Sequence, residues 1–348
     1  MIAVILAGGK GLRLWPESRR NRPKQLCQLV DNKCMLDHTI DRLMAAGAQH
    51  ILVVTGDNLL SQVQETIAQR PDAAQIEVIG EPEGKNTAPA VGLALSRHLS
   101  DQEDPIIGVF PADHHVLDVQ NFGRSIAQAE TAAENGLIAT IGITPKKPET
   151  GYGYIEKTRW EFAHIPGVYQ VNSFCEKPDL NTAQSYIKTG QHMWNSGIYM
   201  GRVSTFLEEF AEHLPEIYEH LTKGFDAYLN SYSLLPSISL DYGIAEKSSR
   251  MAVVPADFGW LDLGSWDALA ELFEKDQSSN VAVGKDIMVL NSQNCVVKQK
   301  DKTVVLYGLK NILVVETDDV IMISDRNKCQ DVRKVVEALR QNNRDDLL

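Results

Sequence analysis

The sequence has few features of a secreted, zinc-dependent or membrane-spanning protein. Its 348 residues include five cysteines, at positions 27, 34, 175, 295 and 329, and no two of them form a CxxC pair. This odd, scattered set supports neither a disulfide framework nor a zinc cluster. No apolar run approaches the roughly 20 residues that a membrane helix needs, and the first residues lack the charged segment that opens a signal peptide. We therefore expect a reduced, cytoplasmic protein that does not enter the membrane.

Positive charge is also scarce. Lysine and arginine number 34 against 46 aspartates and glutamates, which gives a formal net charge of −12. Nucleic acids and anionic membrane surfaces would repel such a chain on average, so we expect it to bind neither. A locally basic segment in an acidic protein indicates a small anionic ligand instead.

Short apolar runs alternate with amphipathic segments over the first 145 residues. Valine- and isoleucine-rich runs bounded by turn residues predict strands at 2–7, 51–55, 76–79, 106–110 and 137–141. Helical spacing predicts helices at 36–46, 59–69, 88–99 and 122–134. This alternation predicts an α/β fold with a Rossmann-like, mostly parallel sheet that is covered on both faces.

The second half of the sequence changes character near residue 277. Up to that point we expect strands at 168–174 and 197–201, with helices near 180–189 and 203–213. Short β runs then recur at 295–297, 304–309, 312–316 and 320–324, and a helix is predicted at 331–341. We therefore predict a catalytic domain over residues 1–276 and a small β-ladder domain with a terminal helix over 281–348.

A glycine-rich, basic loop, LAGGKGLRLWPESRRNRPKQL (residues 6–26), follows the first predicted strand. Between positions 10 and 24 it has one acid, Glu17, and six cations, which are Lys10, Arg13, Arg19, Arg20, Arg22 and Lys24. Ligands bind at the carboxyl ends of parallel strands, and glycines allow backbone N–H groups to approach an anion. The loop therefore indicates a triphosphate site, and the alternative is a tight turn with a solvated basic surface.

Two common phosphate-binding motifs do not fit this loop. The P-loop pattern GxxxxGK[ST] is absent, and GxGxxG fails because Leu14 stands where the third glycine should follow Gly9 and Gly11. A P-loop kinase and a nicotinamide-dependent dehydrogenase are therefore excluded as interpretations.

GGKGLRLWP followed by RPKQ resembles the signature of the nucleotide-sugar pyrophosphorylase family, in particular its mannose-1-phosphate guanylyltransferase branch. Seven further blocks resemble the family in the same order, namely EPEGKNTAPA (81–90), FPADHH (110–115), TGYGYI (150–155), FCEKPD (174–179), WNSGIY (194–199), SLDYGIAEKS (239–248) and FGWLDLGSW (258–266). The chain departs from the family at Leu12, where a threonine or serine is usual, and at Glu17, where a leucine is usual.

The resemblance implies a reaction and a set of site residues. GMP would pass from GTP to α-D-mannose 1-phosphate by Mg²⁺-dependent in-line attack, giving GDP-mannose and pyrophosphate without a covalent intermediate. The implied nucleotide-binding residues are Leu6, Ala7, Gly8, Gly9, Gly11, Arg13, Lys24, Glu81, Asn86, Thr87 and Asp113. The implied catalytic residues are Arg13, Lys24, Asp113 and Asp262, of which Asp113 and Asp262 would hold Mg²⁺. The implied sugar-phosphate-binding residues are Gly153, Glu176, Lys177 and Asn195, with Asp241 and Tyr242 beside them. The family also implies a left-handed β-helix at the C-terminal end and a homodimer.

Several alternatives remain open on the sequence. Asp113 could cap a helix, and Asn86 or Thr87 could be the N-cap of the helix expected at 88–99. Another sugar-1-phosphate nucleotidylyltransferase would share this fold and mechanism, and a non-catalytic nucleotide-sugar-binding regulator would share the fold alone. The length of the chain argues against an added phosphomannose isomerase domain.

Overall fold

The computed structural model describes residues 1–9, 11–99 and 103–348, so Lys10 lies outside the described residues. The chain divides into two compact units. The first unit comprises Met1–Gly8, Thr39–Ala112 and Val116–Trp260, and the second comprises Gly9–His38, Asp113–His115 and Leu261–Leu348. The chain passes from one unit to the other after Gly8, after Ala112, within α1 (Met35–Ala45) and within the short strands β5 (His115–Val116) and β11 (Trp260–Leu261).

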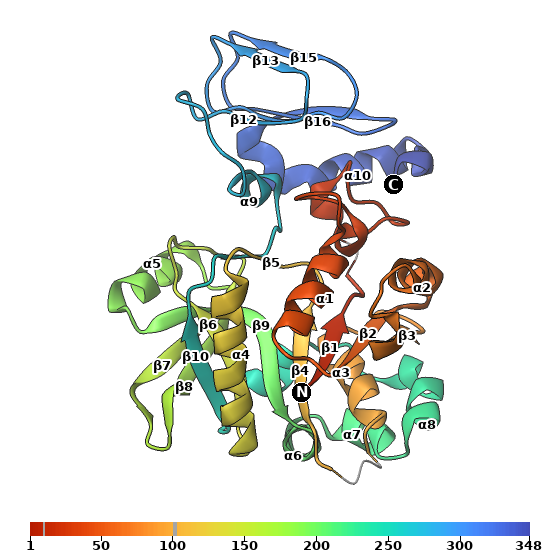
Figure 1. Ribbon diagram of the computed structural model, residues 1–348, viewed down its shortest axis with the longest axis vertical. Coiled ribbons are helices and arrows are strands. Elements are labelled where there is room, and N and C mark those ends of the chain that lie inside the picture. The colour runs from red at the N-terminus through yellow and green to blue at the C-terminus, as the bar shows by residue number, and fades with distance from the viewer. Residues whose placement is uncertain (10, 100–102) are drawn as a thin grey trace. The chain divides into compact units, whose positions relative to one another are not determined.

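A nine-stranded sheet of order β3-β2-β1-β4-β9-β6-β10-β8-β7 forms the centre of the first unit (Figure 1). Its strands are β1 (Ile2–Leu6), β2 (His50–Gly56), β3 (Ile76–Glu81), β4 (Ile106–Pro111), β6 (Ile138–Ile143), β7 (Gly153–Phe162), β8 (Ile165–Glu176), β9 (His192–Arg202) and β10 (Met251–Ala256). Strands β8 and β9 are antiparallel to their neighbours, and the others run in one direction. The prediction of a mostly parallel sheet is therefore confirmed.

Helices bury this sheet. Ala3, Val4 and Ile5 are consecutive and fully buried, and because successive strand residues point to opposite faces, both faces are covered at β1. The remaining helices of the unit are α2 (Leu60–Ala68), α3 (Thr87–Ser96), α4 (Val119–Glu134), α5 (Leu180–Thr189), α6 (Val203–His213), α7 (Pro215–Leu221) and α8 (Phe225–Asn230). Apolar side chains of α3, α6 and α7 share one core with those of β1, β2 and β4.

Two short parallel β ladders form much of the second unit. Strands β12 (Val281–Val283), β14 (Val296–Lys298) and β16 (Ile312–Glu316) pair in parallel, and β17 (Ile321–Asp325) adds to β16 in the antiparallel sense. Strands β13 (Ile287–Leu290) and β15 (Val304–Tyr307) form the other ladder. The unit also contains the 3₁₀ helices η1 (Leu12–Leu14) and η2 (Lys24–Leu26) and the helices α9 (Trp266–Ala270) and α10 (Val332–Gln341).

The basic loop belongs to the second compact unit, and the predicted division into domains 1–276 and 281–348 stays a prediction. The physical reason is a shared core. Leu14, Trp15 and Cys27 are buried in the same apolar cluster as Trp266, and this cluster continues into Val281, Val296, Leu313 and Val315 of the ladder. The Nε1 atom of Trp266 also donates a hydrogen bond to the carbonyl of Trp15 at 3.1 Å.

The predicted strands and helices are confirmed, with ends shifted by a few residues. The sequence analysis missed β7, β10, α7 and α8, and it specified no run for β12, β13 or α9. Strand β10 is apolar, but it contains Pro255, which argues against a central strand, and the outer half of β7 is polar and exposed. Within the described residues, no helix combines the length and the apolar character that a membrane crossing needs.

Candidate functional site

The backbone that follows β1 is held at the carboxyl edge of the sheet. Strands β1 and β4 are parallel neighbours in which Leu6 lies beside Pro111. The Ala7 N–H donates to the Val54 carbonyl at 2.7 Å, and the Ala112 N–H donates to the Leu6 carbonyl at 3.2 Å. The predicted nucleotide-binding residues Leu6 and Ala7 therefore lie where a parallel sheet positions its ligands.

Gly8 packs directly against Glu81. A β-carbon added at Gly8 would lie 2.4 Å from Glu81 Oε1, so only glycine fits there without displacing the carboxylate. Glu81 ends β3 and is buried, and it accepts a hydrogen bond from the Tyr232 hydroxyl at 2.7 Å. Burial raises the pKa of Glu81, the hydrogen bond from Tyr232 opposes this shift, and the charge of Asp57 adds to it. Two predicted nucleotide-binding residues, Gly8 and Glu81, are thus in contact.

Asn86 and Thr87 both have structural roles. Asn86 is the N-cap of α3, its side-chain oxygen accepts from the Thr87 N–H at 3.0 Å, and its φ is 70°. The Thr87 hydroxyl oxygen accepts from the Leu240 N–H at 2.7 Å. The capping alternative is therefore correct for Asn86, and the part of either residue in nucleotide binding stays a prediction.

The four predicted sugar-phosphate residues lie together in the first unit. Gly153 begins β7 and is the register partner of Glu176 at the end of β8. A β-carbon at Gly153 would lie 2.4 Å from Glu176 Oε2 and 3.3 Å from the β-carbon of Asn195. Lys177 Nζ lies 2.5 Å from Glu176 Oε1. Burial alone would lower the pKa of Lys177, but its hydrogen bond and attraction to Glu176 outweigh burial and raise it, so the ammonium group stays charged.

Asn195 is fixed by a polar network. Its amide nitrogen donates to the Tyr199 hydroxyl at 2.9 Å and to Asp241 Oδ1 at 2.8 Å. Its amide oxygen accepts from the Thr140 hydroxyl at 3.2 Å and from the Gly197 N–H at 3.1 Å. The Tyr199 hydroxyl donates to the same Asp241 oxygen at 2.6 Å. Because its donors and acceptor are used, Asn195 is suited to holding Asp241 in place.

The glycine at the centre of this group provides a mutational test. Gly153→Ala should raise the KM for the sugar phosphate by about tenfold, because the new methyl group displaces the Glu176 carboxylate from its position. Steady-state kinetics with each substrate varied in turn would measure this effect. Gly151→Ala is the matched control in the same TGYGYI motif, since a β-carbon at Gly151 meets nothing within 4 Å. Equal KM values for the two variants would contradict the assignment.

The second unit brings three of the four predicted catalytic residues together at Lys24. This lysine is only 5% exposed, and its Nζ lies 2.9 Å from Asp113 Oδ2 and donates to the backbone carbonyl of Asp262. Gly11 supports the arrangement because a β-carbon there would lie 2.5 Å from that of Lys24, and its φ of 53° also favours glycine. At Gly9 a β-carbon would meet nothing within 4 Å.

Asp113 and Asp262 both carry carboxylate side chains, and the electrostatic surroundings of Asp113 are well defined. Burial alone would raise the pKa of Asp113, but the charges of Lys24 and His114 and the hydrogen bond from Lys24 outweigh burial and lower it. Asp262 Oδ1 accepts from the Gly264 N–H at 3.0 Å. The Asp113 side chain is 36% exposed, so solvent and small ligands can reach it.

The cations of the basic loop have different roles. Arg19 makes a two-pronged ion pair with Asp319 at 2.7 and 2.5 Å, and Arg20 lies 3.5 Å from Asp345. Both arginines are therefore tied to residues near the C-terminal end and not directed at a ligand. Arg13 is exposed in η1 and Lys24 is buried in η2. Arg13 and Lys24, the two cations that the family resemblance assigns to the phosphates, stay the predicted phosphate contacts.

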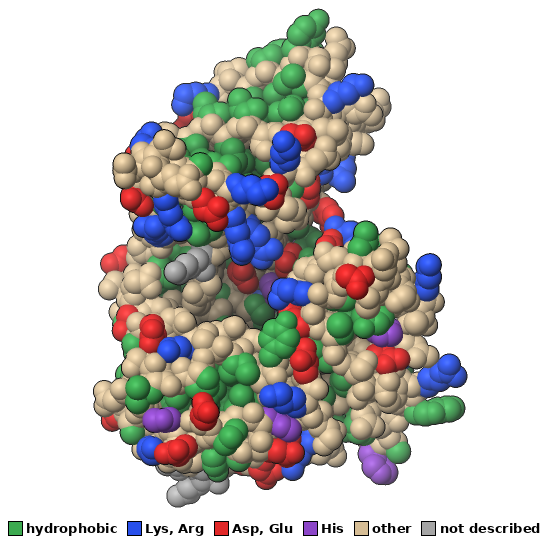
Figure 2. Space-filling view, turned by 180° about the vertical axis from the view of Figure 1, so that it is seen from behind, with side chains coloured by type: hydrophobic (Ala, Val, Ile, Leu, Met, Phe, Trp, Pro, Cys, Tyr) green, Lys and Arg blue, Asp and Glu red, His purple; other side chains and the backbone are tan. Residues whose placement is uncertain are grey.

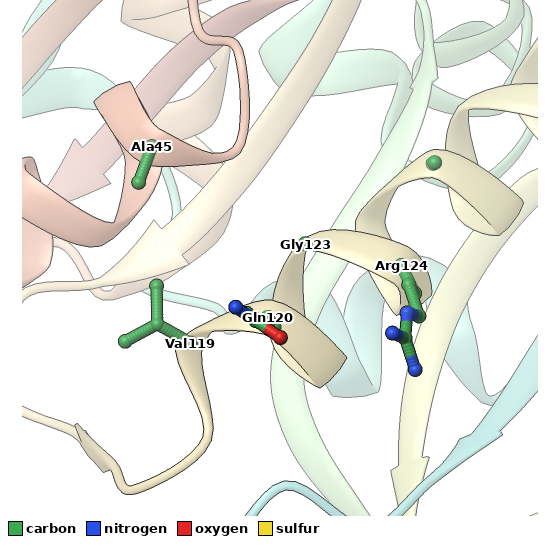
Figure 3. Close-up of a pocket in the computed structure, with 6 residues that line it drawn as sticks. Ala45, Val119, Gln120, Gly123 and Arg124 are labelled. Atoms are coloured by element: carbon green, nitrogen blue, oxygen red, sulfur yellow. The ribbon is translucent and has the colours of Figure 1, made fainter.

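A cavity of about 470 Å³ lies elsewhere in the first unit, over the end of α1 and the first turns of α4 (Figure 3). Ala45, Val119, Gln120, Gly123, Arg124 and Ala127 line it. None of these is a predicted site residue, and the group offers one charged side chain, Arg124. It is therefore not the candidate active site.

Two supporting residues escaped the sequence analysis. Tyr199 is four positions after Asn195 on β9, so strand alternation puts both on one face, and the WNSGIY motif contained this signal. Tyr232 lies 151 positions from Glu81, and nothing in the sequence connects the two residues.

Comparisons with known proteins agree with this arrangement. The sequence matches the nucleotidyl transferase family over residues 2–279 and the MannoseP isomerase/GMP-like beta-helix domain over residues 285–339. The chain belongs to the nucleotidyl transferase family. The resemblance stated from the sequence motifs is thus confirmed, including the β-helix at the C-terminal end.

Its relatives specify the branch of that family. A putative mannose-1-phosphate guanylyltransferase of Vibrio cholerae is 39% identical over 99% of this chain and 75% of its own length. A mannose-1-phosphate guanylyltransferase of Escherichia coli is 38% identical with the same coverage. A solved structure described as a mannose-1-phosphate geranyltransferase from Thermus thermophilus superimposes with a TM-score of 0.88 at 33% identity, covering 97% of this chain and 99% of the other.

Proposed function

We propose that this chain transfers GMP from GTP to α-D-mannose 1-phosphate, giving GDP-mannose and pyrophosphate. The observation that carries the proposal is the convergence of Asp113 and the Asp262 backbone on Lys24, in a chain whose relatives are mannose-1-phosphate guanylyltransferases. A cation beside a carboxylate suits phosphoryl chemistry, in which positioning and charge neutralisation do most of the work.

The site residues divide this work between them. Arg13 and the loop glycines hold the β- and γ-phosphates, while Lys24 neutralises charge at the α-phosphate during attack. Glu81, Asn86 and Thr87 contact the guanine and the ribose. Glu176 accepts sugar hydroxyl groups, and Lys177 neutralises the phosphate of mannose 1-phosphate. The phosphate oxygen of the sugar attacks the α-phosphorus in line, pyrophosphate leaves, and no covalent enzyme intermediate forms.

Mg²⁺ is the metal that these residues fit. Asp113 and Asp262 supply carboxylate oxygens, the ligands that Mg²⁺ prefers together with substrate phosphates. Lys24 contacts the carboxylate of Asp113 and the backbone carbonyl of Asp262, and the Asp113 side chain is partly exposed. When bound, the ion would stabilise negative charge on the reacting phosphates. Lys24 and Arg13 supply the remaining positive charge from the protein itself.

Pyrophosphate release tests the proposed function. Purified protein with Mg²⁺ would be given GTP, ATP, UTP or dTTP, each combined with mannose 1-phosphate or glucose 1-phosphate. We expect release with GTP and mannose 1-phosphate. Release with a different pair would indicate a related sugar-1-phosphate nucleotidylyltransferase. Nucleotide binding without release from any pair would indicate a regulator.

We further propose that the protein forms a homodimer through the β13–β15 ladder and acts in the cytoplasm, where GTP is available. Met288 pairs with Val305 and Leu290 pairs with Tyr307 in this ladder, and all four side chains are exposed. Hydrophobic side chains gather in this region in the space-filling view (Figure 2). A contiguous apolar sheet face of this kind is typical of an association surface.

A charge placed on that face should separate the subunits. Tyr307→Lys should shift the protein from dimer to monomer, because two lysines facing each other across a symmetric interface repel and are desolvated. Sedimentation velocity at micromolar concentration would measure the change. Leu234→Lys, at a 75% exposed site in the first unit, is the control and should leave the dimer intact. A monomeric unmodified protein would refute the proposal.

A further inference from the structure

Two ion pairs connect the predicted phosphate loop to the β ladder within the second unit. Glu17 pairs with Lys298 at the end of β14, and Arg19 pairs with Asp319 in the turn between β16 and β17. The first pair is the more enclosed, because the Glu17 and Lys298 side chains are 10% and 16% exposed while Asp319 is 46% exposed. Glu17 is also a position where this chain departs from the family.

Glu17 lies between the two turns that carry the phosphate-binding cations. Its N–H donates to the Leu14 carbonyl at 3.0 Å, which ties it to η1, the turn that contains Arg13. Its carbonyl lies 3.3 Å from the Cys27 thiol, and the same sulfur lies 3.4 Å from the Pro23 carbonyl. Pro23 precedes Lys24 as the N-cap of η2. A displacement of Glu17 would therefore shift both η1, which contains Arg13, and η2, which contains Lys24.

The ion pair between Glu17 and Lys298 also changes the electrostatic environment of the predicted phosphate site. A carboxylate inside the loop adds negative charge to a segment that must receive a triphosphate, and Lys298 neutralises it. Removing one member of an enclosed ion pair leaves the other charge unpaired, whereas replacing both members with apolar residues is often tolerated. Without Lys298, the Glu17 carboxylate would repel the phosphates or pair with Arg13 or Lys24.

We propose that Lys298 is a positioning residue for nucleotide binding. Acting through Glu17, it keeps the loop in the shape that presents Arg13 and Lys24 to the phosphates of GTP, and it cancels the Glu17 charge there. The β ladder thereby contributes to substrate affinity without touching substrate. This inference rests on the proposed nucleotidyl transfer.

Kinetics with both substrates varied would test the role. Lys298→Met should raise the KM for GTP by about tenfold, the scale of one uncompensated charge near the phosphates, with less than a twofold change in kcat and in the KM for mannose 1-phosphate. Lys298→Arg should retain the unmodified values. Glu17→Leu combined with Lys298→Met should restore the KM for GTP. Lys302→Met, which removes a 65% exposed lysine from the connection between β14 and β15, is the charge-matched control.

Other results would overturn the proposal. A purely structural pair would lower the melting temperature of Lys298→Met while leaving its KM for GTP unchanged. A double variant that folds and still has the raised KM would also refute the role. If Lys298→Met does not fold, Lys298→Gln should raise the KM for GTP selectively, by a smaller factor. An unchanged KM for GTP in Lys298→Gln would refute the role. Failure of the proposed function itself is distinguishable, because the unmodified protein would then release no pyrophosphate.

Discussion

The Asp113→Asn variant should lose at least about 10³-fold of its transfer rate and keep its fold. The substitution preserves the shape of the side chain and removes its negative charge, so the site loses one of its two proposed Mg²⁺ ligands. The cost in unfolding free energy should be about 1–3 kcal/mol, because Lys24, whose side chain is only 6% exposed, loses its charged partner. Pyrophosphate release at saturating Mg²⁺, together with urea unfolding, would measure both quantities.

The matched control for this variant is Asp257→Asn. Asp257 is 61% exposed and lies 3.6 Å from Lys146 at the surface of the first unit, so the same chemical change there should leave the rate unaltered. If Asp113→Asn kept the unmodified rate at saturating Mg²⁺, Asp113 would not hold the metal. Its carboxylate would then serve only as a partner of Lys24.

The sequence predicted an element correctly where the apolar pattern of the segment matches its burial in the folded protein. Strand β1 is a run of apolar residues buried on both faces, and its sequence, IAVIL, is typical of a central strand in a parallel sheet. Strand β7 resisted prediction because its outer half is solvated, and its position is fixed by pairing with β8 and β9, which lie later in the chain. Long-range pairing of this kind leaves no periodic signal in the sequence.

The sequence predicted a set of candidate site residues and could not predict the contacts between them. The motifs named Lys24, Asp113 and Asp262, but the sequence alone could not show that Lys24 contacts both of the other two. It also could not assign Arg19 to Asp319, since these residues are 300 positions apart. Charge counted along the loop therefore overstated the charge available to a ligand, because the ion pair with Asp319 neutralises part of it.

The Lys24→Met variant should lose transfer activity by about 10³-fold, because the charge at the reacting phosphate is no longer neutralised. Methionine retains most of the apolar stem that packs in the buried site. It removes the ion pair to Asp113 and the hydrogen bond to the Asp262 carbonyl. Pyrophosphate release would be compared with that of Lys146→Met, a control at a lysine that is 68% exposed.

The same variant has a predictable pH dependence. In the unmodified protein the pKa of Asp113 lies below its usual value, about 3.9, because the attraction of Lys24 and His114 outweighs burial. A carboxylate with a lowered folded-state pKa contributes stability above the unfolded-state pKa and loses it as the pH falls through the folded-state value. Lys24→Met removes that contribution, and burial then favours the protonated acid. Urea unfolding should therefore show Lys24→Met to be less stable than the unmodified protein at pH 7, with a gap that narrows below about pH 4. A gap that stayed constant between pH 7 and pH 3 would mean that the cost of the substitution comes from lost packing, and not from the charge pair on which the proposed chemistry depends.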